Sequence, residues 1–220
     1  MPRRPAVKRP RWKRRPDARP EEIIEAAIAV FGERGFAHTK LDEVARRAGV
    51  SKGTLYLYFD SKDALFRAMM RQRLEAKIAS AEELVNNWTG SSADLLRAYV
   101  TMHWQSVNHP QNVRLIRLVM SELVSFPELA KWYYQEGVLR MRGIVEKILA
   151  RGVASGEFRQ TNSALTARLL QLLCMQTAQF RHYLMPYDPT PIASEAMLEG
   201  IIDLYLHGIV AEPVHPVSGR

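Results

Sequence analysis

A short polar segment, Ser51 to Thr54, carries side chains that could bind phosphate groups. Its two hydroxyls and the ammonium group of Lys52 can donate hydrogen bonds to phosphate oxygens, and Gly53 leaves room for a close backbone approach. Lys52 also lies in the first turn of an expected helix, where a cation meets the positive end of the helix dipole. That position is locally unfavourable unless an anion binds nearby. The segment therefore indicates a contact with phosphates such as those of a DNA duplex.

The residues that follow this segment could add further donors. Leu55 and Phe59 are four apart and are expected to turn inward, so at least one hydroxyl of the tyrosines between them, Tyr56 and Tyr58, should face outward, while the other tyrosine could pack against the first helix. Lys62 lies in the first turn of the next expected helix, which again favours a bound phosphate. Ordinary helix caps and solvated side chains are the alternative explanation, most of all for Thr39, Lys40, Arg46 and Arg47.

The five residues from Gly49 to Gly53 also fit G-x-S-x-G, the pattern of a serine nucleophile. That nucleophile needs a buried strand before the serine, whereas a polar amphipathic helix with Glu43 and Arg46 precedes it here. Ser51 is better explained as the cap of the next helix. The six histidines include no pair spaced i, i+4, and no H-E-x-x-H or Walker pattern occurs. We therefore expect no catalytic residue, no metal site and no cofactor.

Helical periodicity accounts for almost the whole chain between residues 20 and 210. Gly35 and Gly49 supply helix ends, and the second and third helices are separated only by a tight turn at Gly49, so they form a helix-turn-helix. No β-alternation of useful length appears. We expect an all-α fold with helices at roughly 20–34, 40–48, a third opening at Ser51, and then 61–87, 93–108, 111–124, 127–154, 162–184 and 191–210.

The net charge is concentrated at one end of the chain. The protein has 220 residues and a formal net charge of +8, and nine basic residues with one acidic residue in segment 1–20 account for that excess. Interspersed prolines prevent a continuous helix there. This basic arm could lie on nucleic-acid phosphates, or it could be only a solubilising extension.

A single cysteine, Cys174, excludes an internal disulfide framework and a cysteine-rich zinc module, which favours a reducing compartment. No run of about 18 or more apolar residues occurs, so we expect no membrane span. The basic N-terminus is not followed by the apolar segment of an export signal. We expect a cytoplasmic protein without a membrane partner.

The segment from Phe31 to Phe66, FGERGFAHTKLDEVARRAGVSKGTLYLYFDSKDALF, resembles the DNA-binding domain of the tetracycline-repressor (TetR) family. The resemblance implies an all-α homodimer of about nine helices. In it, an N-terminal three-helix helix-turn-helix domain precedes a larger helical domain that binds a ligand and dimerises. The expected domains are a basic disordered arm over 1–19, a DNA-binding domain over 20–66, a ligand-binding and dimerisation domain over 67–212, and a disordered tail over 213–220.

Site residues can be carried over by position from this resemblance. It implies DNA contacts at Thr39, Lys40, Ser51, Lys52, Gly53, Thr54, Tyr56, Tyr58 and Lys62. The segments SELVSFPEL (121–129) and GVASGEF (152–158) are similar to C-terminal domains of an AefR-like subgroup. In the last two helices the resemblance suggests a dimer interface, although the same residues could equally be core: Leu165, Leu169, Leu172, Phe180, Met197, Ile201, Leu204 and Tyr205.

Between these parts, adaptable apolar and aromatic side chains could line a ligand pocket, or each could simply pack in the core. The candidate pocket residues are Met102, His103, Trp104, Met120, Trp132, Tyr133, Met141, Met175 and Gln176. Positive residues are sparse in this region, so we expect an apolar or aromatic effector rather than a strongly anionic one. The polar groups that could orient it are His103, Arg114, Arg117, Gln176 and Arg181.

The sequence therefore predicts a ligand-responsive regulator that binds double-stranded DNA. Its simplest form is a repressor that binds a pseudo-palindromic operator as a homodimer and is released by a small effector. One alternative is a helical small-molecule-binding protein without DNA binding, which predicts damaged positions in the third helix. The other is a hydrolase that uses the G-x-S-x-G segment, against which the sequence context argues.

Overall fold

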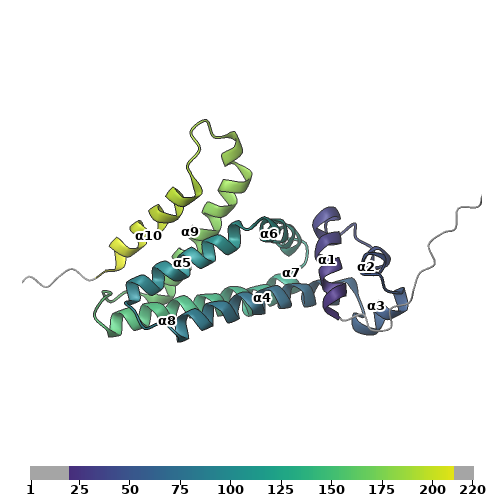
Figure 1. Cartoon of the computed structure of the whole chain (residues 1–220), viewed down its shortest axis with the longest axis horizontal. Helices are drawn as coiled ribbons and strands as arrows, with labels where there is room; N and C mark the ends of the chain where they lie inside the picture. Colours follow the sequence, from purple (N-terminus) through teal and green to yellow (C-terminus); the bar gives the residue numbers. More distant parts are fainter. Residues whose placement is uncertain (1–19, 211–220) are drawn as a thin grey trace, which may run out of the picture. The chain divides into compact units, whose positions relative to one another are not determined.

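The computed structural model describes residues 20–210, and most of them are helical (Figure 1). Within this range there is no strand, only an isolated bridge between Phe158 and Val210, so the predicted all-α fold is confirmed. The expected arm (1–19) and tail (213–220) lie outside the described residues. The helices are α1 (Pro20–Arg34), α2 (Leu41–Ala48), α3 (Lys52–Tyr58), α4 (Lys62–Asn86), α5 (Ser92–Asn108), α6 (Pro110–Leu123), α7 (Pro127–Tyr133), α8 (Arg140–Ala154), α9 (Ser163–Tyr183) and α10 (Ser194–Ile209).

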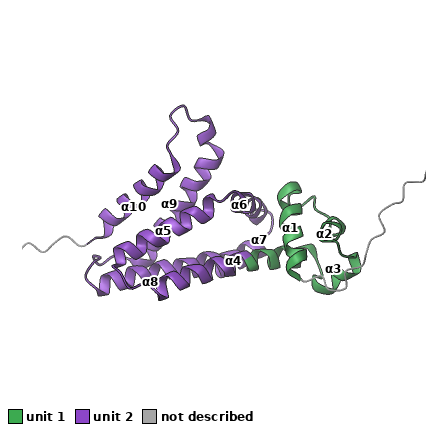
Figure 2. Cartoon of the chain, in the orientation of Figure 1, with its two compact units in different colours: residues 1–72 green, residues 73–220 purple. Residues whose placement is uncertain are grey.

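The chain divides into two compact units, and the boundary falls between Gln72 and Arg73, within α4 (Figure 2). The sequence placed the end of the first domain at residue 66 instead. We call the part up to Gln72 the N-terminal unit and the part from Arg73 the C-terminal unit. No helix between residues 20 and 210 has the length and apolarity that crossing a bilayer requires.

The N-terminal unit is held together by an aromatic cluster. The ring centroids of Phe31, Phe36 and Phe66 are 4.9 to 5.5 Å apart, and all three side chains are buried. Gly49 adopts a left-handed conformation with φ of 71°, which ends α2 and starts the tight turn into α3. Leu55 is buried, as its spacing predicts, and it anchors α3. One face of α3 is thereby fixed to the core while the opposite face stays free.

The C-terminal unit is built around α5, α8 and α9, with α10 packed against α5 and α9. Its core includes Leu95, Ile148 and Leu170, all almost completely buried. Gly152 at the end of α8 is required by close packing, because a Cβ atom there would lie 2.0 Å from Cδ2 of Phe158. The ring of Phe158 therefore lies directly on the backbone of α8.

The predicted helix 127–154 is a continuous helical run, but its middle differs from the prediction. Residues Tyr134–Leu139 form a π-helical segment between α7 and α8. Gly137 lies in this segment, and a Cβ atom there would be 3.2 Å from Cδ2 of Leu74 on α4. Short π segments often occur at functional sites because they change which side chains face inward. Here Tyr134, Gly137 and Val138 face a cavity described below.

Candidate nucleic-acid interface and ligand cavity

Ser51 is the N-cap of α3. Its Oγ accepts a hydrogen bond from the backbone N–H of Thr54 at 3.0 Å and lies 2.7 Å from Oγ1 of the same residue. The helix before it is α2 rather than a buried strand, and the hydroxyl is used in capping. The G-x-S-x-G segment therefore has the geometry of a helix cap and lacks that of a nucleophile elbow.

The free face of α3 is open around Gly53. Among residues 20–210, a Cβ atom at Gly53 would meet only Oγ of Ser51, at 3.8 Å, so packing within this part of the chain does not require a glycine there. Tyr56 and Tyr58 are both exposed, which leaves both hydroxyls accessible. This face can approach a groove of DNA closely, as expected for the second helix of a helix-turn-helix.

Sequence reasoning did not single out Leu57, although it is the most exposed of the large apolar side chains of α3, at 84%. Leu57 follows the buried Leu55 by two residues, which places its side chain about 200° further around the helix axis, away from the core. The spacing therefore predicts that Leu57 is exposed. An exposed leucine on a helix in the major groove can contact a thymine methyl group.

Lys52 is exposed and pairs with Asp42 of α2, with Nζ 2.9 Å from Oδ1. The hydrogen bond and the charge of Asp42 raise the pKa of Lys52. The cation at the start of α3 thus has an internal partner that the sequence did not predict. Because both groups are in contact with solvent, a phosphate can replace this partner without burying a charge.

Thr39 and Lys40 differ in their accessibility. Thr39 is only 3% exposed, and its Oγ1 donates to the backbone oxygen of Gly35 at 2.7 Å. It therefore holds the loop between α1 and α2 and is not on the surface as the DNA contact it was expected to be. Lys40 precedes α2 as its N-cap residue and is exposed, so its ammonium group is available to a phosphate.

Lys62 also has an internal role. Its Nζ donates to the backbone oxygens of Phe36 at 2.8 Å and Ala37 at 3.1 Å, and it lies 4.5 Å from the ring centroid of Phe36. The cation at the start of α4 is thus explained by two carbonyl groups, which together with the ring hold the loop after α1. The phosphate contact expected from the sequence is not needed to explain its position.

We expect the Lys62→Met variant to lose about 1.5–3 kcal/mol of unfolding free energy, the usual value of hydrogen bonds to a charged group. The salt dependence of its DNA affinity should stay as in the unmodified protein. Urea denaturation and DNA titrations at several salt concentrations measure the two effects. Arg46→Met, which removes an exposed cation from α2, is the control for stability. Unchanged stability together with a salt slope reduced by about 1 would restore the phosphate role.

The C-terminal unit contains a cavity of about 400 Å³, within the usual size range of small-molecule sites. Side chains from α4 to α9 line it. Five of the candidate pocket residues lie on it: His103, Met120, Tyr133, Met141 and Met175. The other four do not. Trp104 is buried in the core and its Nε1 donates to Oγ of Ser194 at 3.1 Å, Gln176 is exposed, and Met102 and Trp132 are not among the lining residues.

Of the polar groups expected to orient a ligand, only His103 lies on the cavity. Arg181 donates to Oδ1 of Asn108 at 2.9 Å, and Arg114 and Arg117 are exposed on α6. The expectation that positive residues are sparse is wrong for this cavity, because three cations line it: Lys77, Arg142 and Arg168. Lys77 and Arg168 each follow an alanine, and nothing in their sequence neighbours distinguishes them from solvated residues.

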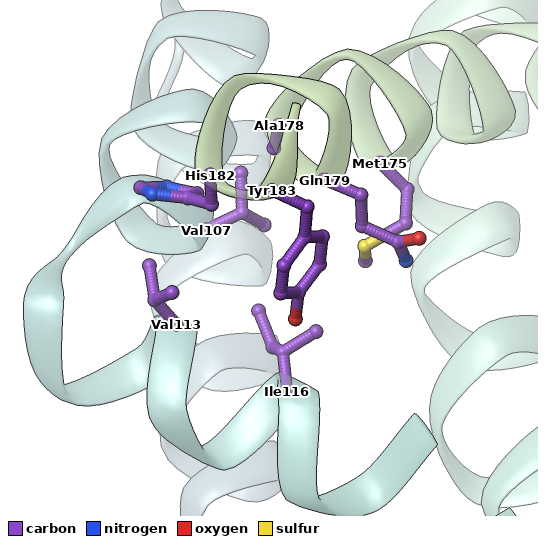
Figure 3. Close-up of a pocket in the computed structure, with 8 residues that line it drawn as sticks. All are labelled: Val107, Val113, Ile116, Met175, Ala178, Gln179, His182 and Tyr183. Carbon is purple, nitrogen blue, oxygen red and sulfur yellow. The ribbon is translucent and has the colours of Figure 1, made fainter. Parts of the chain in front are cut away.

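A second, much smaller pocket lies between α5, α6 and α9 (Figure 3). Its volume of about 10 Å³ has room for a single water molecule at most. Met175 lines both this pocket and the larger cavity. Among residues 20–210, no group of three or more His, Cys, Asp or Glu side chains could hold a metal ion. Of these two pockets, the one within the size range of small-molecule sites is the candidate ligand site.

An exposed apolar face runs along α9. Leu165, Leu169, Leu172 and Phe180 are spaced so that they share one side of the helix, and all four are exposed. On α10, Leu204 is 68% exposed. The remaining interface candidates differ: Ile201 is buried in the core of this chain, Tyr205 donates its hydroxyl to the backbone oxygen of Thr166, and Met197 is partly buried.

Comparisons with known proteins agree with this architecture. Residues 23–69 match the family of bacterial regulatory proteins, tetR family, and residues 94–208 match the C-terminal domain of AefR-like transcriptional repressors. The fatty acid metabolism regulator protein of Bacillus subtilis is 26% identical over 153 residues, which cover 67% of this chain and 74% of that protein. The HTH-type transcriptional regulator RutR of Escherichia coli is 34% identical over 104 residues, only about half of each protein (47% of this chain and 48% of RutR).

Solved structures show the same fold. The transcriptional regulator FadR from Bacillus subtilis, in complex with stearoyl-CoA, superposes with a TM-score of 0.70 at 21% identity, and the match covers 87% of this chain and 100% of that one.

Proposed function

Because the chain belongs to the TetR family of bacterial regulatory proteins, with an AefR-like C-terminal domain, we propose that it is a cytoplasmic, ligand-responsive regulator of transcription. It binds a pseudo-palindromic operator as a homodimer, acts as a repressor, and is released from DNA by a small-molecule effector. The relatives named above are regulators, which fits a protein that is not an enzyme.

The observation that carries the proposal is the free face of α3. Ser51 starts the helix, Gly53 leaves its first turn open, and Tyr56 and Tyr58 are exposed on it. A helical protein that had lost DNA binding would be expected to have a blocked or altered face here. The open first turn supports insertion into a major groove, with Lys40 and Lys52 beside the phosphates.

Dimerisation is supported by the exposed apolar face of α9 together with Leu204. An apolar face of this kind is unfavourable in water and is stabilised when a second copy covers it. In a two-fold dimer the same patch on each protomer meets its counterpart. Ile201 and Tyr205 then support α10 from within the protomer, and the exposed leucines and Phe180 form the contact.

The effector site of this proposal is the cavity of the C-terminal unit. Apolar side chains such as Met120 and Met175 suit a ligand with an apolar or aromatic body. Helix α4 carries Lys62 at its start and Leu74 and Lys77 on the cavity. We expect the ligand to bind better to a conformation in which α4 is displaced and the protein fits the operator less well. Because coupling between two sites is reciprocal, the ligand then lowers the affinity for the operator by the free energy with which the operator lowers the affinity for the ligand.

Selection of bound fragments from random duplex DNA tests the proposal. The full chain is expected to enrich an inverted repeat whose half-site centres are about 10 base pairs, one helical turn, or a multiple apart. An unrelated basic protein selected in parallel controls for charge-driven binding. No enriched sequence, or an enriched sequence without two-fold symmetry, would contradict the proposal.

A further inference from the structure

Among the described residues, those that line the cavity of the C-terminal unit carry an unbalanced positive charge. Lys77 on α4, Arg142 on α8 and Arg168 on α9 line it, and none of the described lining residues is an aspartate or glutamate. His103 on α5 does not add to this charge, because burial and the nearby Lys77 lower its pKa well below the ordinary value. The inner surface is therefore cationic as well as apolar.

Arg142 is the most informative of these cations. It is only 8% exposed, and no carboxylate of the described residues forms an ion pair with it. Its Nε donates to Oε1 of Gln171 at 3.4 Å, and its hydrogen bond and charge lower the pKa of the Tyr134 phenol. Neutral partners of this kind orient a guanidinium group but do not neutralise it. A buried charge without a counter-charge is unfavourable, which indicates that an anion from outside the chain completes this site.

Lys77 is a second cation of the cavity without a counter-charge among the described residues. No hydrogen bond or ion pair to it is found among residues 20–210, and burial lowers its pKa to about 8. Nδ1 of His103, on the same cavity, is buried and has no hydrogen-bond partner in the described part of the chain. Two unpaired polar side chains thus meet on the inner wall.

The two cations line the same cavity at neighbouring levels of α9. Arg142 contacts Gln171 of α9, and Lys77 is near Cys174 of the same helix. Gln171 and Cys174 are three residues apart, which corresponds to roughly 4.5 Å along the helix axis. Arg168 is exposed and marks the solvent side of the cavity.

The remaining wall suits a hydrocarbon. Leu74, Met120, Met141, Leu172 and Met175 line it, and methionine side chains adapt to ligands of differing shape. The cavity therefore offers two chemically different regions to one molecule.

We propose that the effector is an amphipathic acid whose anionic head group pairs with Arg142 and Lys77 and whose apolar body lies among the leucines and methionines. This proposal rests on the proposed function in taking the cavity as the effector site. The sequence predicts an apolar or aromatic effector that is not strongly anionic. The ligand proposed here keeps the apolar body and adds one carboxylate or phosphate group.

Calorimetric titration of the full-length protein with dodecanoate, dodecyl phosphate and dodecanol tests the head group, with the two anions below their micelle concentrations and the alcohol below its solubility limit. We expect at least one of the anions to bind about 30-fold more tightly than the alcohol, since a desolvated charge pair commonly contributes that much. The tighter of the two anions identifies a carboxylate or a phosphate head group. Equal affinity for dodecanol, or no binding of either anion, overturns the proposal.

Substitutions then test the residues. Arg142→Gln is expected to weaken binding of the preferred anion about 30-fold and to leave dodecanol binding unchanged. Lys147→Gln removes an exposed cation from the same helix and should change neither affinity. A purely structural role for Arg142 would lower thermal stability and both affinities together, which would overturn the assignment. Lys77→Gln gives the same test if Arg142→Gln does not fold.

Titrations with DNA separate this proposal from the proposed function. If the anion binds through Arg142 but does not change the affinity for a selected duplex, the head-group site stands and the effector role of the cavity fails. If the unliganded protein does not bind DNA at all, the regulator proposal fails whatever the calorimetry shows. Release of DNA by dodecanol as efficiently as by either anion would overturn the head-group site alone.

Discussion

Replacing Gly53 with glutamate is expected to abolish binding to the operator while leaving the protein folded. Gly53 lies in the first turn of α3, where a Cβ atom would have open space around it. Within the helix the change is favourable, because glycine is the weaker helix former by about 1 kcal/mol and a carboxylate suits the positive end of the dipole. Against DNA the same carboxylate faces phosphates, and we expect the affinity to fall about 100-fold or more. Fluorescence anisotropy with a selected duplex measures it.

Two variants control this experiment. Gly53→Ala adds only a methyl group and should cause a smaller loss of DNA affinity with a gain in stability. Gly32→Glu introduces the same charge at another open, exposed helical glycine, in α1, and should reduce affinity only slightly. If Gly53→Glu binds as well as Gly32→Glu, α3 does not enter the groove by its first turn.

The second large effect is expected from Leu169→Glu. Leu169 is exposed near the middle of the apolar face of α9, so the protomer should fold normally. In a two-fold dimer the substitution places two carboxylates in one interface, and leaving a charge unpaired there costs about 2–5 kcal/mol. We expect dissociation to monomers at micromolar concentration, with loss of tight operator binding. Sedimentation velocity measures the dissociation to monomers, and fluorescence anisotropy measures the loss of operator binding.

Val124→Glu is the matched control for Leu169→Glu, because Val124 is also an exposed apolar residue but follows α6 and lies off α9 and α10. It should leave the oligomeric state unchanged. If both variants remain dimeric, the dimer contact lies elsewhere on the chain.

Local signals explain why most helices could be predicted. Gly35 and Gly49 end helices through left-handed conformations, and Ser51 and Ser61 cap the helices that follow by accepting backbone hydrogen bonds. These are short-range effects that the sequence displays directly. The π segment Tyr134–Leu139 carries no comparable mark, because its apolar residues still fit a helical period.

The side chains that were misassigned have partners distant in the sequence. Lys62 binds the backbone oxygen of Phe36, 26 residues away, and Lys52 pairs with Asp42 across the turn. Neither partner can be identified from spacing alone. The charge of the cavity was missed for the same reason, since Arg142 meets Gln171 only after α8 and α9 pack.

Protection of guanine N7 from dimethyl sulfate, on a duplex enriched by selection, tests whether α3 enters the major groove, because N7 faces that groove. We expect two protected clusters on one face of the duplex, about one helical turn or a multiple apart, which disappear with Gly53→Glu. Protection of a single cluster, no protection of N7 in a bound complex, or an identical pattern with Gly53→Glu would contradict this expectation.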